Sequence, residues 1–225
     1  LMENLTLIIP AKNESESLPI FLNELKKYKY KKMIVLQKDD IKTIESLKGY
    51  DEVDIFEQNQ LGYGNAIIEG INNTKTEYFC IINADGSMDP KYLPLMLDTC
   101  KDYDLVFTSR YLRPGGGSDD DTFVTLLGNK IFSFLGNFLF NLGISDILFT
   151  YILGKTNSIK FLELKSHDFR LCVELPIKAK KFNLKYKDIP SYERVRIDGF
   201  KKVNALKDGF LILISIISLF FMKKK

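Results

Sequence analysis

A carboxylate follows an apolar segment directly in the middle of the chain. The run Tyr78–Ile82 predicts a buried strand, and the sequence Asn-Ala-Asp-Gly-Ser-Met-Asp-Pro follows it at positions 83–90. Side chains at the end of a parallel strand lie at the crevice where open α/β sheets bind ligands. The Asp85 carboxylate, flanked by small residues, is suited to hold a divalent cation against a diphosphate. Asn83 stands where a second acid is expected.

Three other segments place polar groups where a predicted element begins or ends. The first apolar strand ends in Pro-Ala-Lys-Asn-Glu at positions 10–14, which brings backbone groups and the Glu14 carboxylate to an edge of the sheet. The segment Gly62–Ala66 opens a helix, so its backbone amides are candidates to face an anion. It lacks the third glycine of a dinucleotide fingerprint and follows the third strand, which disfavours a nicotinamide cofactor. Arg110 follows a later strand and adds a cation near the same edge.

Short apolar strands alternate with amphipathic helices from residue 5 to about residue 108. The predicted strands are Leu5–Pro10, Lys32–Gln37, Glu52–Glu57, Tyr78–Asn83 and Leu105–Thr108, and the predicted helices are Glu14–Tyr28, Ile41–Leu47, Gly64–Asn72 and Lys91–Asp98. This alternation predicts an α/β fold, with a mostly parallel sheet flanked by helices. The charged, glycine-rich segment 113–121 predicts a mobile loop or a plain solvated linker.

The composition excludes several classes of function. With 225 residues, 45% of them hydrophobic, the chain can bury a full core in one domain or in one domain with a small appendage. A net charge of +3 and the lack of a basic stripe argue against nucleic acid as a partner. The three cysteines have no paired spacing and predict reduced core thiols in a cytosolic compartment. A single histidine, His167, nearly excludes histidine-based metal sites and triads.

The chain changes character from residue 122. The segment 123–153 is rich in Phe, Leu and Ile, and either an ordinary buried helix pair or helices lying against a membrane would explain it. Residues 210–222 are uncharged and apolar, and Lys223–Lys225 follow. A bilayer crossing takes about 20 apolar residues. This tail therefore predicts an amphipathic, membrane-associated segment or the start of a longer span, with its lysines among headgroups on the cytoplasmic side.

Five segments in order carry a resemblance to a known family. They read IIPAKNE, GYGNAIIEGI, NADGSMDP, TSRY and SYERVRIDGFKKVNALKDGF. Together they resemble the family 2 glycosyltransferases of the GT-A fold, especially the dolichyl-phosphate mannose synthase and polyprenyl-phosphate glycosyltransferase branch. Each segment alone is a weak signal, but five in register over about 200 residues form a specific one.

The resemblance implies a donor site with a metal. Residues expected to hold the base and ribose are Pro10, Ala11 and Glu14, and further candidates for the nucleotide-sugar site are Asn13, Gly62, Asn65, Asp85 and Arg110. Asp85 matches the second acid of the family's D-x-D motif, Asn83 the first acid, and Ser87 a further metal-side position. The implied cofactor is Mg²⁺ or Mn²⁺.

The resemblance also implies groups that act on the phosphates. Arg196, Gly199 and Lys202 match the family's R-x-x-G-x-S-K segment, which lies over the donor and acceptor phosphates. Asp146 matches the acid ahead of the family's S-G-F-R stretch and is the one candidate for a general base. The candidate catalytic residues are thus Asp85, Arg196, Lys202 and Asp146.

The sequence departs from the family pattern at several positions. Asn83 removes one negative charge from the metal site, although its amide oxygen is still a hard ligand. The segment Gln37–Asp40 replaces the usual acidic D-D-G-S pattern, which leaves the base open. The segment Phe149–Ile152 replaces S-G-F-R, so that arginine is missing.

The expected activity is inverting transfer of a sugar from a nucleotide-diphosphate donor to a polyprenyl phosphate at the cytoplasmic face of a membrane. The alternatives are a family 2 enzyme acting on a glycan hydroxyl and a catalytically weak homologue that binds a nucleotide sugar. We expect a donor-binding half (residues 2–121), an acceptor-side half of the same domain (122–205) and an apolar membrane-associated segment (206–225). The sequence leaves the sugar, the lipid and the oligomeric state open.

Overall fold

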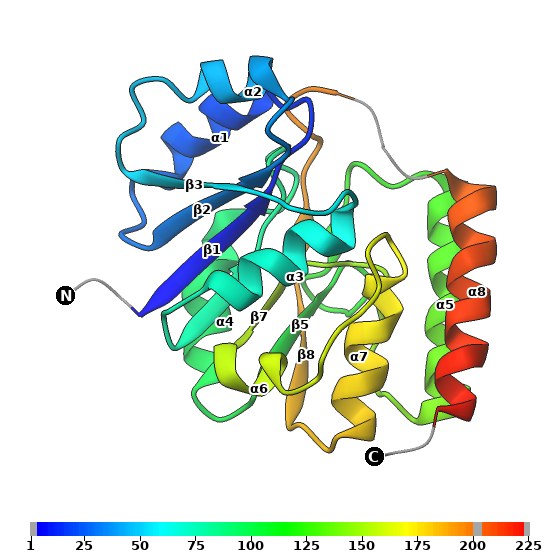
Figure 1. Cartoon of the computed structure of the whole chain (residues 1–225). Coiled ribbons are helices and arrows are strands. Elements are labelled where there is room, and N and C mark those ends of the chain that lie inside the picture. Colours follow the sequence, from blue (N-terminus) through cyan, green and yellow to red (C-terminus); the bar gives the residue numbers. More distant parts are fainter. Residues whose placement is uncertain (1–3, 200–203, 223–225) are drawn as a thin grey trace.

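A seven-stranded sheet forms the centre of the protein, which a computed structural model describes over residues 4–199 and 204–222 (Figure 1). The strand order is β3-β2-β1-β4-β7-β5-β8, and β7 runs antiparallel to its two neighbours while the other pairings are parallel. The strands are β1 (Leu5–Pro10), β2 (Lys31–Leu36), β3 (Val53–Glu57), β4 (Tyr78–Ile81), β5 (Leu105–Ser109), β7 (Ile152–Lys155) and β8 (Tyr186–Pro190). A second, two-stranded sheet pairs β6 (Gly117–Ser118) with β9 (Tyr192–Glu193). The predicted α/β fold is confirmed.

Helices cover both faces of the large sheet (Figure 1). One face packs against α1 (Ser17–Leu25), α2 (Ile41–Ser46) and α4 (Leu93–Cys100), which follows a 3₁₀ turn at Pro90–Tyr92. The other face packs against α3 (Tyr63–Asn73), α6 (Thr156–Lys160) and α7 (Leu171–Lys181). Because both faces are covered, the central strands are mostly apolar and do not alternate between apolar and polar residues. In β1, for example, Leu7 faces one hydrophobic cluster and Ile8 the other.

Two long helices form a further layer outside α7. They are α5 (Phe123–Phe140) and α8 (Ala205–Phe221), which lie side by side in Figure 1. They run in the same direction, since Val124 and Leu206 near their beginnings line the same cavity and the Phe140 and Phe220 rings meet near their ends. Among the described residues, α5 is the one helix that is long and apolar enough to cross a membrane by length and composition, with a mean hydropathy of 1.4.

The predicted elements before residue 110 all form, with shifted ends. Strand β1 has the predicted bounds, whereas the helix expected at Glu14–Tyr28 is shorter and covers Ser17–Leu25. Strand β4 ends at Ile81 and not at Asn83, because the chain turns there into the loop that carries Asp85. The candidate metal-binding residues therefore lie in a loop beyond the strand.

The expectation of a helix pair over residues 123–153 is wrong. Only α5 is helical there; Asn141 ends it in the left-handed conformation, and the chain then forms β7. Strand β7 is inserted between β4 and β5, and a Cβ at Gly154 would lie 2.4 Å from the Leu105 side chain. A short, fully apolar strand has no alternation to distinguish it from a helix. The large sheet thus combines strands from both predicted halves.

Candidate active site

The loop after β4 orients the Asp85 carboxylate. Asp85 Oδ1 accepts hydrogen bonds from the Ser87 backbone N–H at 3.0 Å and from Ser87 Oγ at 2.8 Å. Gly86 between them has φ +73°, a conformation that favours glycine. Ser87 is buried, and its hydroxyl is committed to Asp85. Ser87 and Asp85 were both predicted at the metal site; in the structure Ser87 holds the Asp85 carboxylate in position.

Residues 194–197, which follow β9 and are called the strap, lie across the loop that carries Asp85. The Arg194 backbone N–H donates to the Ser87 carbonyl at 2.8 Å, and the Ile197 N–H donates to the Asp85 carbonyl at 2.9 Å. The Arg194 guanidinium donates to the Gly86 carbonyl and to both oxygens of Glu24 on α1. These bonds join a segment near the end of the chain to the acidic loop and to the first helix.

The strap brings Arg196 to the cleft side of Asp85. Its guanidinium lies 3.5 Å from Asp85 Oδ2 and donates to Asp120 at 2.7 and 3.3 Å. Burial favours the neutral form, but the hydrogen bonds that Arg196 donates to Asp120 and the charge of Asp85 outweigh it, so the pKa of Arg196 is raised. One cation thus bridges two carboxylates where a metal and a diphosphate are expected. Lys202, the other predicted cation, lies outside the described residues.

The loop offers a partial set of ligands for a divalent cation. Asp85 and Asn83 present oxygen atoms, and Asn83 Oδ1 accepts a hydrogen bond from the Tyr63 hydroxyl at 3.0 Å. Within the described residues, no group of three or more His, Cys, Asp or Glu side chains is placed to hold a metal. Mg²⁺ commonly binds through one or two carboxylates and completes its shell with water and substrate phosphates. The residues present fit such a cation, provided that a diphosphate supplies further ligands.

Residues at the ends of β1, β2 and β3 line one end of the cavity beside Asp85. They are Pro10, Ala11, Lys12, Glu14, Gln37 and Gln58. Strand pairing brings them together, because the Ala11 N–H donates to the Val35 carbonyl and the Gln58 N–H to the Leu36 carbonyl. Pro10, Ala11 and Glu14 thus lie at the cavity as predicted. Asn13 does not line it, and its backbone N–H donates to Asp40, which caps α2.

Residues 166–167 pack against the beginning of α3, where the sequence predicted backbone amides that face an anion. The Asn65 backbone N–H donates to the His167 carbonyl at 3.2 Å, and the Asn65 side chain donates to the Leu61 carbonyl. A Cβ at Gly62 or Gly64 would lie 2.1 Å from a backbone oxygen of residues 166–167. These glycines therefore allow two backbone segments to pack closely. Gly62 still lines the cavity, whereas Asn65 does not.

Arg110 belongs to a buried ion network. Its guanidinium pairs with both oxygens of Asp146 at 2.7 and 3.0 Å and with Glu193 at 3.0 Å, and it lies over the Phe149 ring. Burial favours the neutral form, but the charge of Asp146 outweighs it and the pKa of Arg110 is raised. Asp146 also accepts from the Asn129 side chain and is fully buried. Asp146 is not among the residues that line the cavity, and its contacts are those of a residue that positions Arg110; its expected role as a general base stays a prediction.

One cavity of about 530 Å³ joins these polar groups to the two outer helices. Its far end is lined by Val124, Gly128 and Phe132 of α5 and by Leu206, Gly209 and Ile212 of α8. Sequence reasoning missed this end, and it also missed Asp120 and Tyr63. Asp120 lies in the segment 113–121, which is tied down by β6 and by Arg196. The three consecutive aspartates at positions 119–121 were the sequence feature that could have pointed to Asp120.

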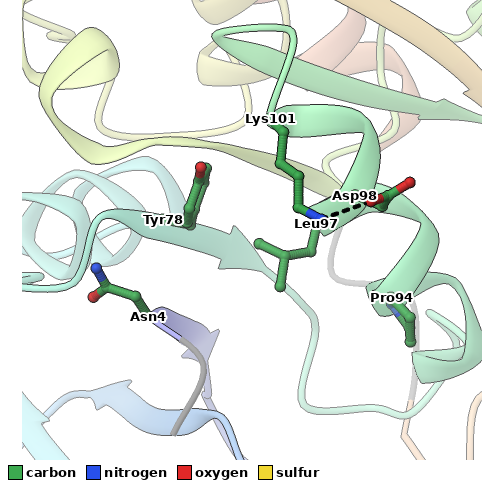
Figure 2. Close-up of a pocket in the computed structure, with 6 residues that line it drawn as sticks. All are labelled: Asn4, Tyr78, Pro94, Leu97, Asp98 and Lys101. Carbon is green, nitrogen blue, oxygen red and sulfur yellow. Dashed lines mark hydrogen bonds and ion pairs between the residues drawn. The ribbon is translucent and has the colours of Figure 1, made fainter. Parts of the chain in front are cut away.

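A second hollow, of about 330 Å³, lies at the amino ends of the strands (Figure 2). Its lining is Asn4, Tyr78, Pro94, Leu97, Asp98 and Lys101. Asp98 and Lys101 pair with each other at 2.8 Å on the surface of the molecule. Because ligands of open α/β sheets bind at the carboxyl ends of the strands, the cavity beside Asp85 is the candidate active site.

Comparison with known families agrees with this architecture. The family model described as Glycosyl transferase family 2 matches residues 6–162. The chain belongs to glycosyl transferase family 2. Uncharacterised glycosyltransferases of Mycobacterium tuberculosis and Mycobacterium bovis are 34% identical to it over 115 residues, which make up 50% of this chain and 50% of each relative. The chain thus spans about half the length of the curated relatives it matches.

Solved structures of another enzyme share the fold. Glucosyl-3-phosphoglycerate synthase from Mycobacterium tuberculosis, in complex with Mn²⁺, uridine diphosphate and phosphoglyceric acid, aligns with a TM-score of 0.71 and 14% identity over 98% of this chain and 80% of that chain. The same enzyme with Mn²⁺, uridine-diphosphate-glucose and phosphoglyceric acid aligns with a TM-score of 0.69 and 16% identity over 98% of this chain and 81% of that chain. At these identities the likeness shows the GT-A fold.

Proposed function

We propose that this chain transfers a sugar, with inversion, from a nucleoside-diphosphate sugar to a polyprenyl phosphate at the cytoplasmic face of a membrane. The observation that carries the proposal is the single cavity that extends from Asp85 to the α5–α8 pair. A nucleotide sugar matches its polar end, since the related glucosyl-3-phosphoglycerate synthase binds uridine-diphosphate-glucose and Mn²⁺. An isoprenoid chain matches its apolar end.

The carboxylates of the cavity favour a phosphate acceptor over a hydroxyl acceptor. Those that line it among the described residues are Glu14, Asp85, Asp120, Asp121 and Glu193. Each accepts a hydrogen bond or ion pair: Asp121, for example, accepts from the Tyr111 and Thr125 hydroxyls, and Glu193 from Arg110 and Ser118. A sugar hydroxyl needs a general base to become a good nucleophile. A phosphate oxygen is already ionised at neutral pH and needs none.

The proposed reaction is a single displacement. An oxygen of the acceptor phosphate forms a bond to the anomeric carbon, while the bond from that carbon to the donor diphosphate breaks and its electron pair leaves with the nucleoside diphosphate. Asp85 and Asn83 would hold the divalent cation, which neutralises charge on the diphosphate. Arg196 stabilises the negative charge that develops on the leaving group, because its guanidinium lies beside Asp85.

The outer faces of α5 and α8 support a membrane location. On α5 the exposed side chains include Phe123, Phe134 and Phe138, whereas the buried ones are Asn129, Ser133 and Gly136. On α8 the exposed residues again include large apolar ones, Leu206, Phe210 and Phe221. A helix with its apolar side outward and its polar side inward is typical of contact with lipid and not of contact with water. The three buried free cysteines agree with a reducing compartment.

The proposal is tested by incubating the purified protein with radiolabelled nucleotide sugars, a polyprenyl phosphate in detergent and Mg²⁺ or Mn²⁺. We expect label in the lipid fraction, and we expect its loss in Asp85→Ala. Asp98→Ala, a surface carboxylate away from the cavity, is the matched control and should retain full activity.

Three outcomes would contradict the proposal. Label on a soluble glycan and none on lipid would identify a hydroxyl acceptor. Tight nucleotide binding without transfer to any acceptor would identify a catalytically weak homologue. Full activity of Asp85→Ala would remove the role assigned to that carboxylate.

A further inference from the structure

Two glycines in the middle of α5 have different surroundings. A Cβ at Gly136 would lie 2.7 Å from the Ile147 side chain and 2.9 Å from Leu142, so close packing requires glycine there. A Cβ at Gly128 would meet no atom within 4 Å. Glycine in a helix interior is less stable than alanine, because its backbone loses more freedom on folding. Neither backbone conformation nor packing in this structure accounts for glycine at position 128.

The open space at Gly128 is the apolar end of the active-site cavity. Gly128 lines that cavity between Val124 and Phe132, one helical turn away on either side. The opposite wall comes from α8, where a Cβ at Gly209 would lie 3.9 Å from the Phe132 ring. The cavity thus passes between the two helices, and Phe132 narrows it against Gly209. A side chain on Gly128 would occupy this passage.

We propose that Gly128 determines acceptor use by keeping the passage between α5 and α8 open for the first isoprenoid units of the lipid phosphate. This inference rests on the proposed function and adds a residue that admits the acceptor. The passage is continuous with the cavity around Asp85 and Arg196, which would receive the phosphate. Val124 and Leu206, at the beginnings of the two helices, line the same cavity and are also exposed large apolar side chains. An isoprenoid chain is the occupant that suits an apolar passage leading from a phosphate site to a lipid-facing surface.

If Gly128 serves the acceptor and not the helix, replacing it should stabilise the helix, and a large side chain there should impair use of the acceptor. Gly128→Ala should raise Tm by about 2 °C, because alanine is the better helix former and meets no neighbour. Gly128→Leu should raise KM for polyprenyl phosphate by about tenfold or abolish transfer, because its side chain fills the passage. Binding of the nucleoside diphosphate with Mn²⁺, measured by thermal shift, should stay within about twofold of the wild type, because the cavity residues that follow β1, β2 and β3 do not belong to α5.

Two variants serve as controls. Gly209→Leu fills the passage from the opposite wall and should reproduce the loss of acceptor use. Gly136→Ala places a methyl group into packed side chains and should lower Tm without selective loss of acceptor use.

The inference is overturned if Gly128→Leu keeps the wild-type KM and kcat for polyprenyl phosphate, or if it loses nucleotide binding in the same proportion. A wild-type protein that labels no polyprenyl phosphate at all would instead refute the proposed function. The two failures are therefore distinguishable.

Discussion

Among the described residues, Arg196 is the side chain that forms an ion pair with Asp85. The Arg196 guanidinium lies 3.5 Å from Asp85 Oδ2 and is held there by Asp120. A divalent cation on Asp85 competes with Arg196 for the carboxylate, and the donor diphosphate then offers the guanidinium new anionic partners. Arg196 is therefore expected to weaken metal binding in the absence of nucleotide and to strengthen the binding of metal and nucleotide together.

Arg196→Gln should separate these two effects. Mn²⁺ affinity without nucleotide should rise about fivefold, because a competing charge beside Asp85 is removed. Affinity for a nucleoside diphosphate in the presence of Mn²⁺ should fall, because a phosphate partner is lost. Electron paramagnetic resonance of free Mn²⁺ and calorimetry with the nucleotide measure the two quantities. Lys91→Gln is the control, since Lys91 pairs with Asp89 in the same loop; an equal rise in Mn²⁺ affinity there would indicate a general charge effect.

A second carboxyl group of interest lies outside the cavity. Asp188 on β8 accepts two hydrogen bonds from Ser145 at Oδ2, while its buried Oδ1 has no partner among the described residues. Burial raises the pKa of Asp188, and the hydrogen bonds from Ser145 offset this only in part. The folded state thus binds this proton more tightly than the unfolded state does, so stability falls as pH rises from the unfolded pKa, about 4, through the raised folded pKa.

Asp188→Asn should change the pH dependence of stability in a defined direction. The amide is neutral in both states, so the free energy of unfolding of the variant relative to wild type should increase between pH 4 and pH 7. Chemical denaturation at several pH values measures this difference. The surface variant Asp98→Asn controls for removal of a negative charge. A difference for Asp188→Asn that is flat or decreases with pH would contradict the raised pKa.

At the scale of the element, α5 has its polar side toward the protein and its apolar side outward. Phe134 and Phe138 stack on each other and are 66% and 74% exposed, whereas Asn129 faces the Arg110–Asp146 network. The same helix thus borders the active site on one side and presents an apolar surface on the other. Through Asn129 the helix is anchored to the sheet edge.

The double variant Phe134→Ser/Phe138→Ser should bind vesicles containing anionic lipid about tenfold more weakly than wild type, because two apolar side chains no longer enter the interface. Its free energy of unfolding in detergent-free buffer should change by less than about 0.5 kcal/mol per residue, because these rings are exposed. Co-sedimentation with vesicles and urea unfolding measure the two effects. Ile20→Ser/Leu95→Ser, on helices of the opposite sheet face, is the matched control. Equal vesicle binding by both double variants would contradict a membrane role for α5.

At the scale of the whole molecule, the site is built from segments far apart in the chain. The strap near residue 196 closes over a loop near residue 85 and is fixed to Glu24 on the first helix. Strand β7 enters the middle of the sheet from the second half of the chain. Helix α8 packs against α5 and α7, so the last described helix completes the wall of the cavity. The polar and the apolar ends of the cavity therefore depend on the whole fold.

Much of the fold could be predicted from the sequence, and the site only in part. The strands and helices before residue 110 follow from apolar runs and helical spacing, which are local properties. Asp85, Pro10, Ala11 and Glu14 lie at the cavity for the same reason, since strand ends gather at one edge of a parallel sheet. Strand β7 was missed because its four residues carry no periodic signal.

The sequence by itself determined that this chain is an α/β protein of family 2 type with an acid at a strand end, because apolar periodicity and ordered motifs are written along the chain. The tertiary structure decided which partner each charge has. Arg196 pairs with Asp120, 76 positions away, and Arg110 with Asp146, 36 away. Only the tertiary structure could decide this, because the energy of an ion pair depends on distance and burial in space, and spacing along the chain specifies neither.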